Sequence, residues 1–161
     1  MKKIRQEPTP QEYLQGGLLD QLDFHDTFAT TNHQNSLKEI AHLIFDNPTD
    51  WIKGLFTVRN KLVRLVGLKT EIPADYHKNF EPGGYIGFFK IFSISDTELV
   101  LGADDSHLNF RAVLKIKPQP TFNIKVITLV QFNNSFGRFY MKIIKPFHRL
   151  VIMQLVKNGY K

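Results

Sequence analysis

The sequence SFGRFYMKIIKPFHRLVIMQLVK, residues 135–157, decides the predicted fold. Its apolar side chains recur at helical spacing and predict one broad apolar face: Phe136, Phe139, Tyr140, Ile143, Phe147, Leu150 and Val151. Its basic side chains repeat every three or four residues and predict a basic stripe on the opposite face: Arg138, Lys142, Lys145 and Arg149. A helix of this length needs a large apolar partner surface, which we expect a β-sheet to provide.

Pro146 lies in the middle of this predicted helix, where its missing backbone N–H predicts a kink. Residues 133–135 are expected to cap the start of the helix. Beyond the kink, residues 150–156 are apolar nearly all round, so we expect that end to be buried or to contact another chain. A homodimer through the end of the helix is therefore one hypothesis. His148 lies beside the basic stripe and is expected to face water.

The composition is that of a soluble globular domain of 161 residues, with 42% hydrophobic and 22% charged residues. Its 14 phenylalanines favour a wide core or an apolar cavity. The absence of cysteine excludes disulfides, thiolate metal sites and cysteine nucleophiles. No apolar run reaches the roughly 18 residues of a membrane span, and no signal peptide is predicted, so the expected location is cytoplasmic.

The net charge of +6 is unevenly distributed along the chain. Residues 106–161 hold ten of the 21 lysines and arginines and none of the 15 acidic residues. A basic half of this kind is compatible with an anionic membrane or with nucleic acid as a partner. Because the basic residues are spaced singly and not in runs, a solvated face is the favoured interpretation, and a nucleic-acid partner is not expected.

Residues 1–21 are polar and contain several prolines and glycines, and they are predicted to form an N-terminal arm. The remainder, residues 22–161, is predicted to be a single domain. Its first strand is predicted over residues 22–31. The apolar face of this strand also carries Asp26, and a carboxylate in that position must be paired or lie at an edge.

Two amphipathic helices are predicted next. Ser36 and Glu39 have the pattern of a capping box, which starts the first helix. The second follows Pro48, ends near Gly67 and is expected to direct five apolar side chains inward: Trp51, Leu55, Val58, Leu62 and Leu65. Residues 68–83 then form a long irregular connection, which is expected to cover a cavity as a lid.

Four further strands are predicted over residues 84–95, 98–102, 108–117 and 122–132. Gly87, in the first of them, is expected to be a bulge or a point of close backbone approach. The third strand alternates apolar and polar residues, and its polar face is expected to contact water: Asn109, Arg111, Lys115 and Lys117.

This order of elements predicts an α+β fold, in which a curved antiparallel sheet grips the long C-terminal helix and two helices follow the first strand. A curved sheet leaves space beneath the helix, and phenylalanine-rich walls suit an apolar ligand. Six side chains are expected to line this cavity: Phe28, Trp51, Phe88, Phe110, Tyr140 and Phe147. Asp26 and Arg59 are expected to reach the same cavity as polar groups.

The segment GADDSH, residues 102–107, has two interpretations. Its two carboxylates and histidine have the chemistry of a divalent metal site or of an acid and a base. Glycine, aspartate and serine between two strands are also typical of a hairpin turn. The turn is favoured because one short loop supplies too few metal ligands, and no metal or cofactor is predicted. His107 and Arg111 are expected to form a solvent-facing pair.

Arg59 lies in the middle of the second predicted helix. We favour a structural ion pair with Asp26, Asp104 or Asp105 over a contact with a ligand carboxylate. The six histidines show no zinc-binding spacing, and the sequence contains no nucleophile elbow and no P-loop. No catalytic residue is therefore assigned.

Three stretches of the sequence are similar to one protein family. They are WIKGLFTVRNKLV (51–63), LGADDSHLNFR (101–111) and FGRFYMKIIKPFHR (136–149), which span most of the chain. The chain resembles the family called domain of unknown function 2867, which is similar to the START-like, or Bet v 1-like (SRPBCC), helix-grip superfamily. The resemblance implies a hydrophobic cavity for lipids or other small apolar molecules, and it implies no catalytic residues. Some relatives carry an NAD(P)-binding reductase domain, whose Gly-x-Gly-x-x-Gly turn this sequence lacks.

Three functions are compatible with these observations. The favoured one is binding of a small hydrophobic ligand or lipid in a cavity between the sheet and the C-terminal helix. The second is a cyclase or hydratase type of enzyme, with Asp26, Arg59, His107 or Tyr140 as polar groups in that cavity. The third is a protein whose basic last helix binds a membrane or nucleic acid.

Overall fold

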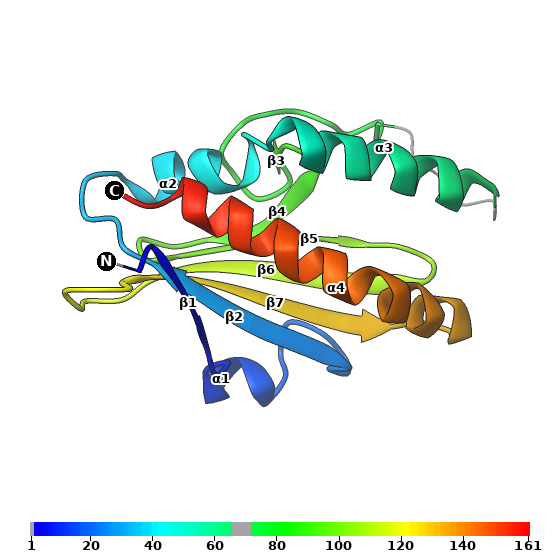
Figure 1. Cartoon of the computed structure of the whole chain (residues 1–161), viewed down its shortest axis with the longest axis horizontal. Coiled ribbons are helices and arrows are strands. Elements are labelled where there is room, and N and C mark those ends of the chain that lie inside the picture. Colours follow the sequence, from blue (N-terminus) through cyan, green and yellow to red (C-terminus); the bar gives the residue numbers. More distant parts are fainter. Residues whose placement is uncertain (1, 66–71) are drawn as a thin grey trace.

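The computed structural model describes residues 2–65 and 72–161 (Figure 1). Its elements follow the chain in this order: β1 (Ile4–Glu7), α1 (Gln11–Leu14), β2 (Phe24–Thr30), α2 (Leu37–Phe45), α3 (Asp50–Leu65), β3 (Tyr85–Ile86), β4 (Phe89–Ile94), β5 (Glu98–Asp104), β6 (Leu108–Ile116), β7 (Ile124–Phe132) and α4 (Ser135–Asn158). The predicted α+β class is confirmed, as is the capping box of Ser36 and Glu39 at the start of α2. The predicted helix end at Gly67 and residues 68–71 of the predicted lid lie outside the described residues.

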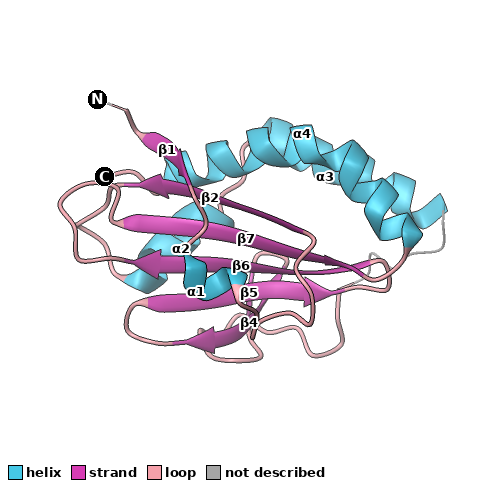
Figure 2. Cartoon of the chain, turned by 90° about the horizontal axis from the view of Figure 1, so that it is seen from below, coloured by secondary structure: helices cyan, strands magenta, loops and turns pink. Residues whose placement is uncertain are grey.

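The strands form a seven-stranded antiparallel sheet in the order β1-β2-β7-β6-β5-β4-β3. Figure 1 shows α2, α3 and α4 above this curved sheet and α1 below it. Figure 2, seen from below, shows α1 in front of the strands. We call the side covered by α2, α3 and α4 the inner face of the sheet and the opposite side the outer face.

A tight turn divides the single strand predicted over residues 84–95 into β3 and β4. Ile86 pairs with Phe89, so the chain reverses at once. Gly87 has a φ of 58°, in the left-handed region that glycine adopts in two-residue hairpin turns. A Cβ at this position would also lie 2.9 Å from the carbonyl oxygen of Phe45. The prediction of a bulge was therefore wrong, and the prediction of a close backbone approach is confirmed.

The outer face of the sheet is covered, so the prediction that the polar face of β6 contacts water was wrong. Arg111 exposes only 8% of its surface, and Val113 on the same face is fully buried. The cover comes from residues 13–22, because Tyr13 is buried there against apolar side chains of the sheet. The Tyr13 hydroxyl donates to the Glu98 carboxylate. Burial and this carboxylate both raise the pKa of Tyr13.

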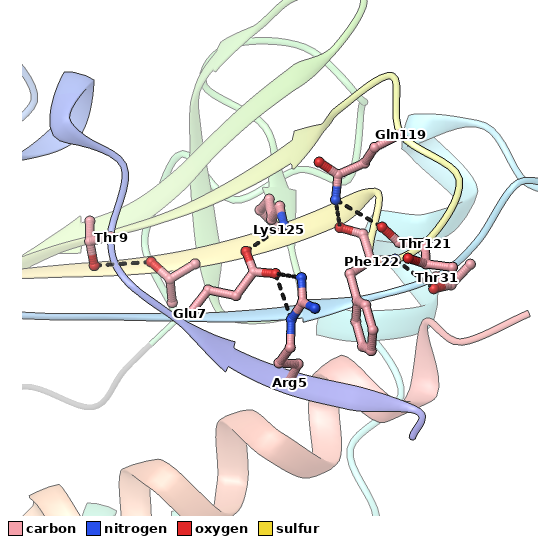
Figure 3. A network of polar contacts seen from close by, with 9 residues as sticks. Arg5, Glu7, Thr9, Thr31, Gln119, Thr121, Phe122 and Lys125 are labelled. Carbon is pink, nitrogen blue, oxygen red and sulfur yellow. Dashed lines mark hydrogen bonds and ion pairs between the residues drawn. The ribbon is translucent and has the colours of Figure 1, made fainter. Parts of the chain in front are cut away.

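A polar network around Glu7 ties β1 to the rest of the sheet (Figure 3). The Glu7 carboxylate accepts hydrogen bonds from Lys125 of β7 and from Arg5. Burial raises the pKa of Glu7, but these hydrogen bonds and positive charges outweigh that effect and hold the pKa below its ordinary value. Figure 3 also shows Phe122, whose N–H donates to the Thr31 hydroxyl at 2.7 Å. One carboxylate thus joins β1 to β7 across β2.

The helix α4 turns a different side toward the sheet from the predicted one. Four side chains of the predicted apolar face are exposed: Phe139, Ile143, Phe147 and Leu150. The buried positions are instead Gly137, Met141, Ile152, Leu155 and Val156. Gly137 explains this rotation, because a Cβ there would lie 1.9 Å from the carbonyl oxygen of His107. Only glycine lets the start of α4 approach the β5–β6 turn so closely.

The end of α4 is buried within the chain, which is one of the two predicted alternatives. The helix continues through Pro146, and three of its last side chains join α2 in the main core: Ile152, Leu155 and Val156. A buried polar contact secures the residues that follow, because the Asn32 side-chain amide donates to the Gly159 carbonyl at 2.8 Å. Asn32 and Asn123 also exchange two hydrogen bonds, of 2.9 and 2.8 Å.

The inward side of α3 also differs from the predicted one. Ile52 and Val63 are buried, and Phe56 and Arg59 between them are half-buried. Four side chains that were predicted to point inward are exposed: Trp51, Val58, Leu62 and Leu65. The side chains that face inward include Arg59. The row predicted to face inward is entirely apolar, and it lies on the exposed side of this helix.

Candidate functional site

A cavity of about 570 Å³ lies between the inner face of the sheet, α3 and α4. Aromatic side chains form much of its wall: Phe45, Phe56, Phe88, Phe89 and Phe110. Ile72 and Phe88 line the cavity while most of their own surface is exposed, which places them at its mouth. A smaller hollow of about 210 Å³ lies on the outer face beside residues 13–22. Ligand pockets measure about 300–1,000 Å³, so of these two only the inner cavity has the size for a small molecule.

The structure distributes the eight predicted site residues over several environments. Four of them line the cavity: Arg59, Phe88, Phe110 and Tyr140. Phe28 is fully buried in the main core. Trp51 and Phe147 lie on the outsides of α3 and α4 and are exposed. Asp26 is paired with His148, which itself lines the cavity.

The described part of the predicted lid, residues 72–83, contributes to the cavity wall. Three of its side chains line the cavity: Ile72, Pro73 and Tyr76. The Tyr76 hydroxyl donates to the Gly87 carbonyl at 3.0 Å, and its ring packs on Tyr85 with centroids 4.8 Å apart. This connection is therefore anchored to the β3–β4 hairpin at the edge of the sheet.

Polar side chains of α3 and α4 meet in the wall of the cavity. Arg59 Nε donates to the Tyr140 hydroxyl at 3.1 Å, and its Nη1 donates to Asn60 at 3.0 Å. The ring of His107 meets the ring of Tyr140 edge-on, with centroids 4.9 Å apart. We call Arg59, Tyr140 and His107 the polar cluster of the cavity.

The predicted ion pair between Arg59 and an aspartate is absent from the described residues. Asp104 pairs with Arg111 at 2.8 Å. Asp26 pairs with His148 at 3.1 Å. The arginine is therefore held by hydrogen bonds to two neutral side chains. It lines the cavity, and no carboxylate of the described chain lies within 4.0 Å of its guanidinium.

His107 is buried, so the prediction that it faces solvent beside Arg111 was wrong. Only 2% of the surface of His107 is exposed, and neither ring nitrogen has a hydrogen-bond partner in the described chain. Burial lowers the pKa of His107, the negative charge of Asp105 opposes this shift, and the positive charge of Arg59 adds to it. The imidazole is therefore neutral at pH 7 and offers one N–H donor and one acceptor.

Asp26 and His148 form a half-buried pair beside the cavity. Asp26 Oδ2 lies 3.1 Å from His148 Nε2, and the other carboxylate oxygen is buried without a partner among the described residues. The prediction that Asp26 must be paired or lie at an edge is confirmed, and the prediction that His148 faces water was wrong. A carboxylate in this position orients the imidazole that it contacts.

The predicted hairpin turn in the segment of residues 102–107 is confirmed, although residues 102–104 belong to β5 and the turn itself is residues 105–107. Asp104 pairs with Asn109 across the two strands, and the Asp105 N–H donates to the Leu108 carbonyl at 2.9 Å. Throughout residues 2–65 and 72–161, no group of three or more His, Cys, Asp or Glu side chains is placed to hold a metal ion.

Tyr76, Phe89 and His148 are among the residues of the cavity wall that were not predicted as site residues from the sequence. For His148 a signal was present, because Tyr140, Ile144 and His148 repeat every four residues on α4. Because Tyr140 was predicted to line the cavity, this spacing also predicts that His148 faces the cavity. Tyr76 lies in an irregular segment, where no periodicity exists to indicate a direction.

Residues 18–155 match a family model described as "Protein of unknown function (DUF2867)". The chain belongs to this family. The match begins before β2 and ends within the last turns of α4, so it includes the elements that form the cavity, and it confirms the resemblance drawn from the three sequence stretches. No curated protein and no solved structure matches this DUF2867 member. Among its described helices, none combines the length and the apolar character needed to cross a membrane.

Proposed function

We propose that this DUF2867 protein binds a small hydrophobic ligand or lipid in the cavity between the sheet and α4. The observation that carries the proposal is the cavity itself, which measures about 570 Å³ and is walled largely by aromatic and aliphatic side chains. A START-like relationship of the family supports the same mode of binding and is part of this proposal. The cavity is large enough for a molecule of several rings or for a medium-length hydrocarbon chain.

The energetic argument rests on the apolar wall. Removing apolar surface from water is worth about 25 cal/mol per Å². Side chains that face an open space also lack the van der Waals contacts of a close-packed interior. A hydrophobic ligand restores these contacts and covers exposed wall residues such as Phe88, whose own surface is 70% exposed.

Extraction of the purified protein is the first test. The protein is prepared without detergent, denatured and extracted with organic solvent, and the extract is analysed by mass spectrometry. The expected result is a lipid or other apolar compound in stoichiometric amount, and its structure would name the ligand class.

A neutral fluorescent probe, N-phenyl-1-naphthylamine, tests protein that carries no ligand. Ala112 lines the cavity, so Ala112→Leu is expected to fill part of it and to weaken probe binding several-fold. Ala74→Leu adds the same atoms at an exposed turn and serves as the matched control. Circular dichroism checks that both variants fold. Absence of probe binding by the wild type, or equal binding by all three proteins, would contradict the proposal.

The Asp26–His148 pair favours a second candidate function, an enzyme of the cyclase or hydratase type. A carboxylate that orients an imidazole beside a substrate cavity is the arrangement of many general bases. The 3.1 Å separation of the pair and the presence of His148 in the cavity wall support this candidate. The test incubates compounds of the extracted class with the wild type and with His148→Gln. If the wild type converts the compound and His148→Gln does not, the result supports an enzyme. If the wild type leaves the compound unchanged, the enzyme candidate is rejected.

A further inference from the structure

The Arg59 guanidinium is the starting point, because it is a half-buried cation in the wall of an apolar cavity. Its two hydrogen bonds in the described chain go to neutral groups, the Tyr140 hydroxyl and the Asn60 side chain. A guanidinium taken partly out of water is stabilised best by an anion, and a carboxylate matches its planar geometry. No such anion lies within 4.0 Å in the part of the chain that the structure describes.

The neighbours of Arg59 in the polar cluster add two more hydrogen-bond donors. The Tyr140 oxygen accepts from Arg59, so its own hydrogen is left for another acceptor. His107 is 2% exposed, lines the cavity and has no partner for either ring nitrogen among the described residues. A buried imidazole without partners is costly, so a group that accepts from its N–H would stabilise it.

Two other charged groups of the cavity wall, Lys90 and Asp104, are paired with an opposite charge within the protein. Lys90 pairs with Asp75 at 3.0 Å, and Asp104 pairs with Arg111 at 2.8 Å. His148 also lines the cavity and contacts the Asp26 carboxylate at 3.1 Å. Asp105 also lines the cavity, is half-buried and opposes the lowering of the His107 pKa, so its charge acts on the same region. An anionic ligand at Arg59 therefore gains from three donors and is opposed by the Asp105 carboxylate of the same wall.

We infer that the ligand of this cavity is an amphipathic carboxylic acid whose carboxylate is bound by Arg59, Tyr140 and His107. Its hydrocarbon body lies against the aromatic wall that includes Phe89 and Phe110. This inference rests on the proposed function and specifies its ligand class. An alcohol of the same length would lose the charge-assisted hydrogen bonds, and an amine would be repelled by Arg59.

The test compares three probes that share one hydrocarbon chain: dodecanoate, dodecanol and dodecylamine. Their dissociation constants are measured at pH 7.5 by displacement of N-phenyl-1-naphthylamine, below the concentrations at which they aggregate. The wild type is expected to bind dodecanoate about tenfold more tightly than dodecanol, the factor that corresponds to one charge-assisted hydrogen-bond system. Dodecylamine is expected to bind most weakly.

Variants assign this preference to the polar cluster. Arg59→Met is expected to weaken dodecanoate binding about tenfold and to leave dodecanol binding unchanged within about twofold. Tyr140→Phe and His107→Phe are expected to act in the same direction with smaller factors. Asp105→Asn removes the opposing charge and is expected to strengthen dodecanoate binding. Lys61→Met removes one positive charge from an exposed position of the same helix and is the matched control.

The outcomes separate this inference from the proposed function. Equal binding of dodecanoate and dodecanol by the wild type, or a preference for dodecylamine, overturns the carboxylate inference and leaves hydrophobic binding intact. An equal loss of dodecanoate binding in Lys61→Met and Arg59→Met also overturns it, because the effect would then come from net charge. Absence of binding by all three probes and by the fluorophore contradicts the proposed function itself.

Discussion

At one end of the helical layer Ile40, Ile44 and Val156 are fully buried, whereas at the other end Val58 and Leu62 expose 56% and 59% of their surfaces. We call the first region, where α2 packs on the last turns of α4, the closed end. The second, where α3 lies beside the first turns of α4, is the open end. Both ends use the same sheet and the same long helix, so neither the sheet nor α4 alone decides which end closes.

The difference lies in what each short helix turns inward. At the closed end α2 presents only apolar side chains to the core, and buried asparagines fix the residues after α4. At the open end α3 presents Phe56 and Arg59, and collapse of this row onto the sheet would bury a guanidinium without a carboxylate. The open end thus coincides with the charged residue on the inward side of α3.

The largest expected effect concerns the closed end. Ile44→Ala is expected to lower the free energy of unfolding by about 4 kcal/mol, because Ile44 is fully buried and the close-packed surroundings leave a cavity. Urea denaturation followed by circular dichroism measures this loss. A loss below about 1 kcal/mol would show that the closed end repacks as freely as the open end.

A smaller effect is expected where α4 approaches the β5–β6 turn. Gly137→Ala places a Cβ 1.9 Å from the His107 carbonyl oxygen, and such overpacking is expected to cost about 2 kcal/mol. Gly54→Ala, on the exposed side of α3, meets no atom within 4 Å and is expected to stabilise the protein by up to about 1 kcal/mol. The same denaturation measurement compares the two variants. Effects of equal sign would mean that Gly137 does not set the position of α4.

The pH dependence of stability tests the burial of His107 at the open end. The unfolded pKa of 6.5 is lowered in the folded protein, so the unfolded chain takes up the proton first as the pH falls. The stability that depends on neutral His107 is complete above pH 6.5 and is lost as the pH falls from 6.5 through the folded pKa. Thermal melts of the wild type and of His107→Phe over this range should differ in slope. Parallel pH profiles would indicate that His107 is solvated.

The smallest effect is expected on the outside of the open end. Leu62→Ser replaces an exposed apolar side chain and is expected to change the free energy of unfolding by no more than about 0.5 kcal/mol. Urea denaturation of this variant beside Ile44→Ala gives the contrast between the two ends directly. A loss of several kcal/mol would show that this side chain is covered in solution.

The fold class was predictable because its signals are local and repeat along the chain. Short apolar runs, with alternation in residues 108–117, indicated the strands, and the Ser36–Glu39 pattern indicated the start of α2. The side on which α3 and α4 pack was not predictable from the same signals. Both helices carry apolar residues on two sides, and the choice between the sides depends on contacts made far along the chain, such as Gly137 against His107.

Much of the candidate site escaped prediction for the same reason. His107 follows Asp105 and Ser106 in a sequence that is typical of an exposed turn, and its burial comes from Phe136 and Tyr140 of α4. The pairing of Asp26 with His148 joins residues at opposite ends of the chain. The composition predicted an apolar cavity. The polar cluster of its wall was visible only in the tertiary structure.

The position of β2 beside β7 has a consequence for the synthesis of this protein on the ribosome. Phe24 of β2 pairs with Val130 of β7, so the early strand must wait until more than 100 further residues have been translated. The helices α2 and α3 emerge in the meantime, before the strands and the long helix that cover them. Contacts of such high sequence separation form slowly and leave apolar surface uncovered during elongation. The apolar side of α2 therefore stays uncovered until the last turns of α4 leave the exit tunnel.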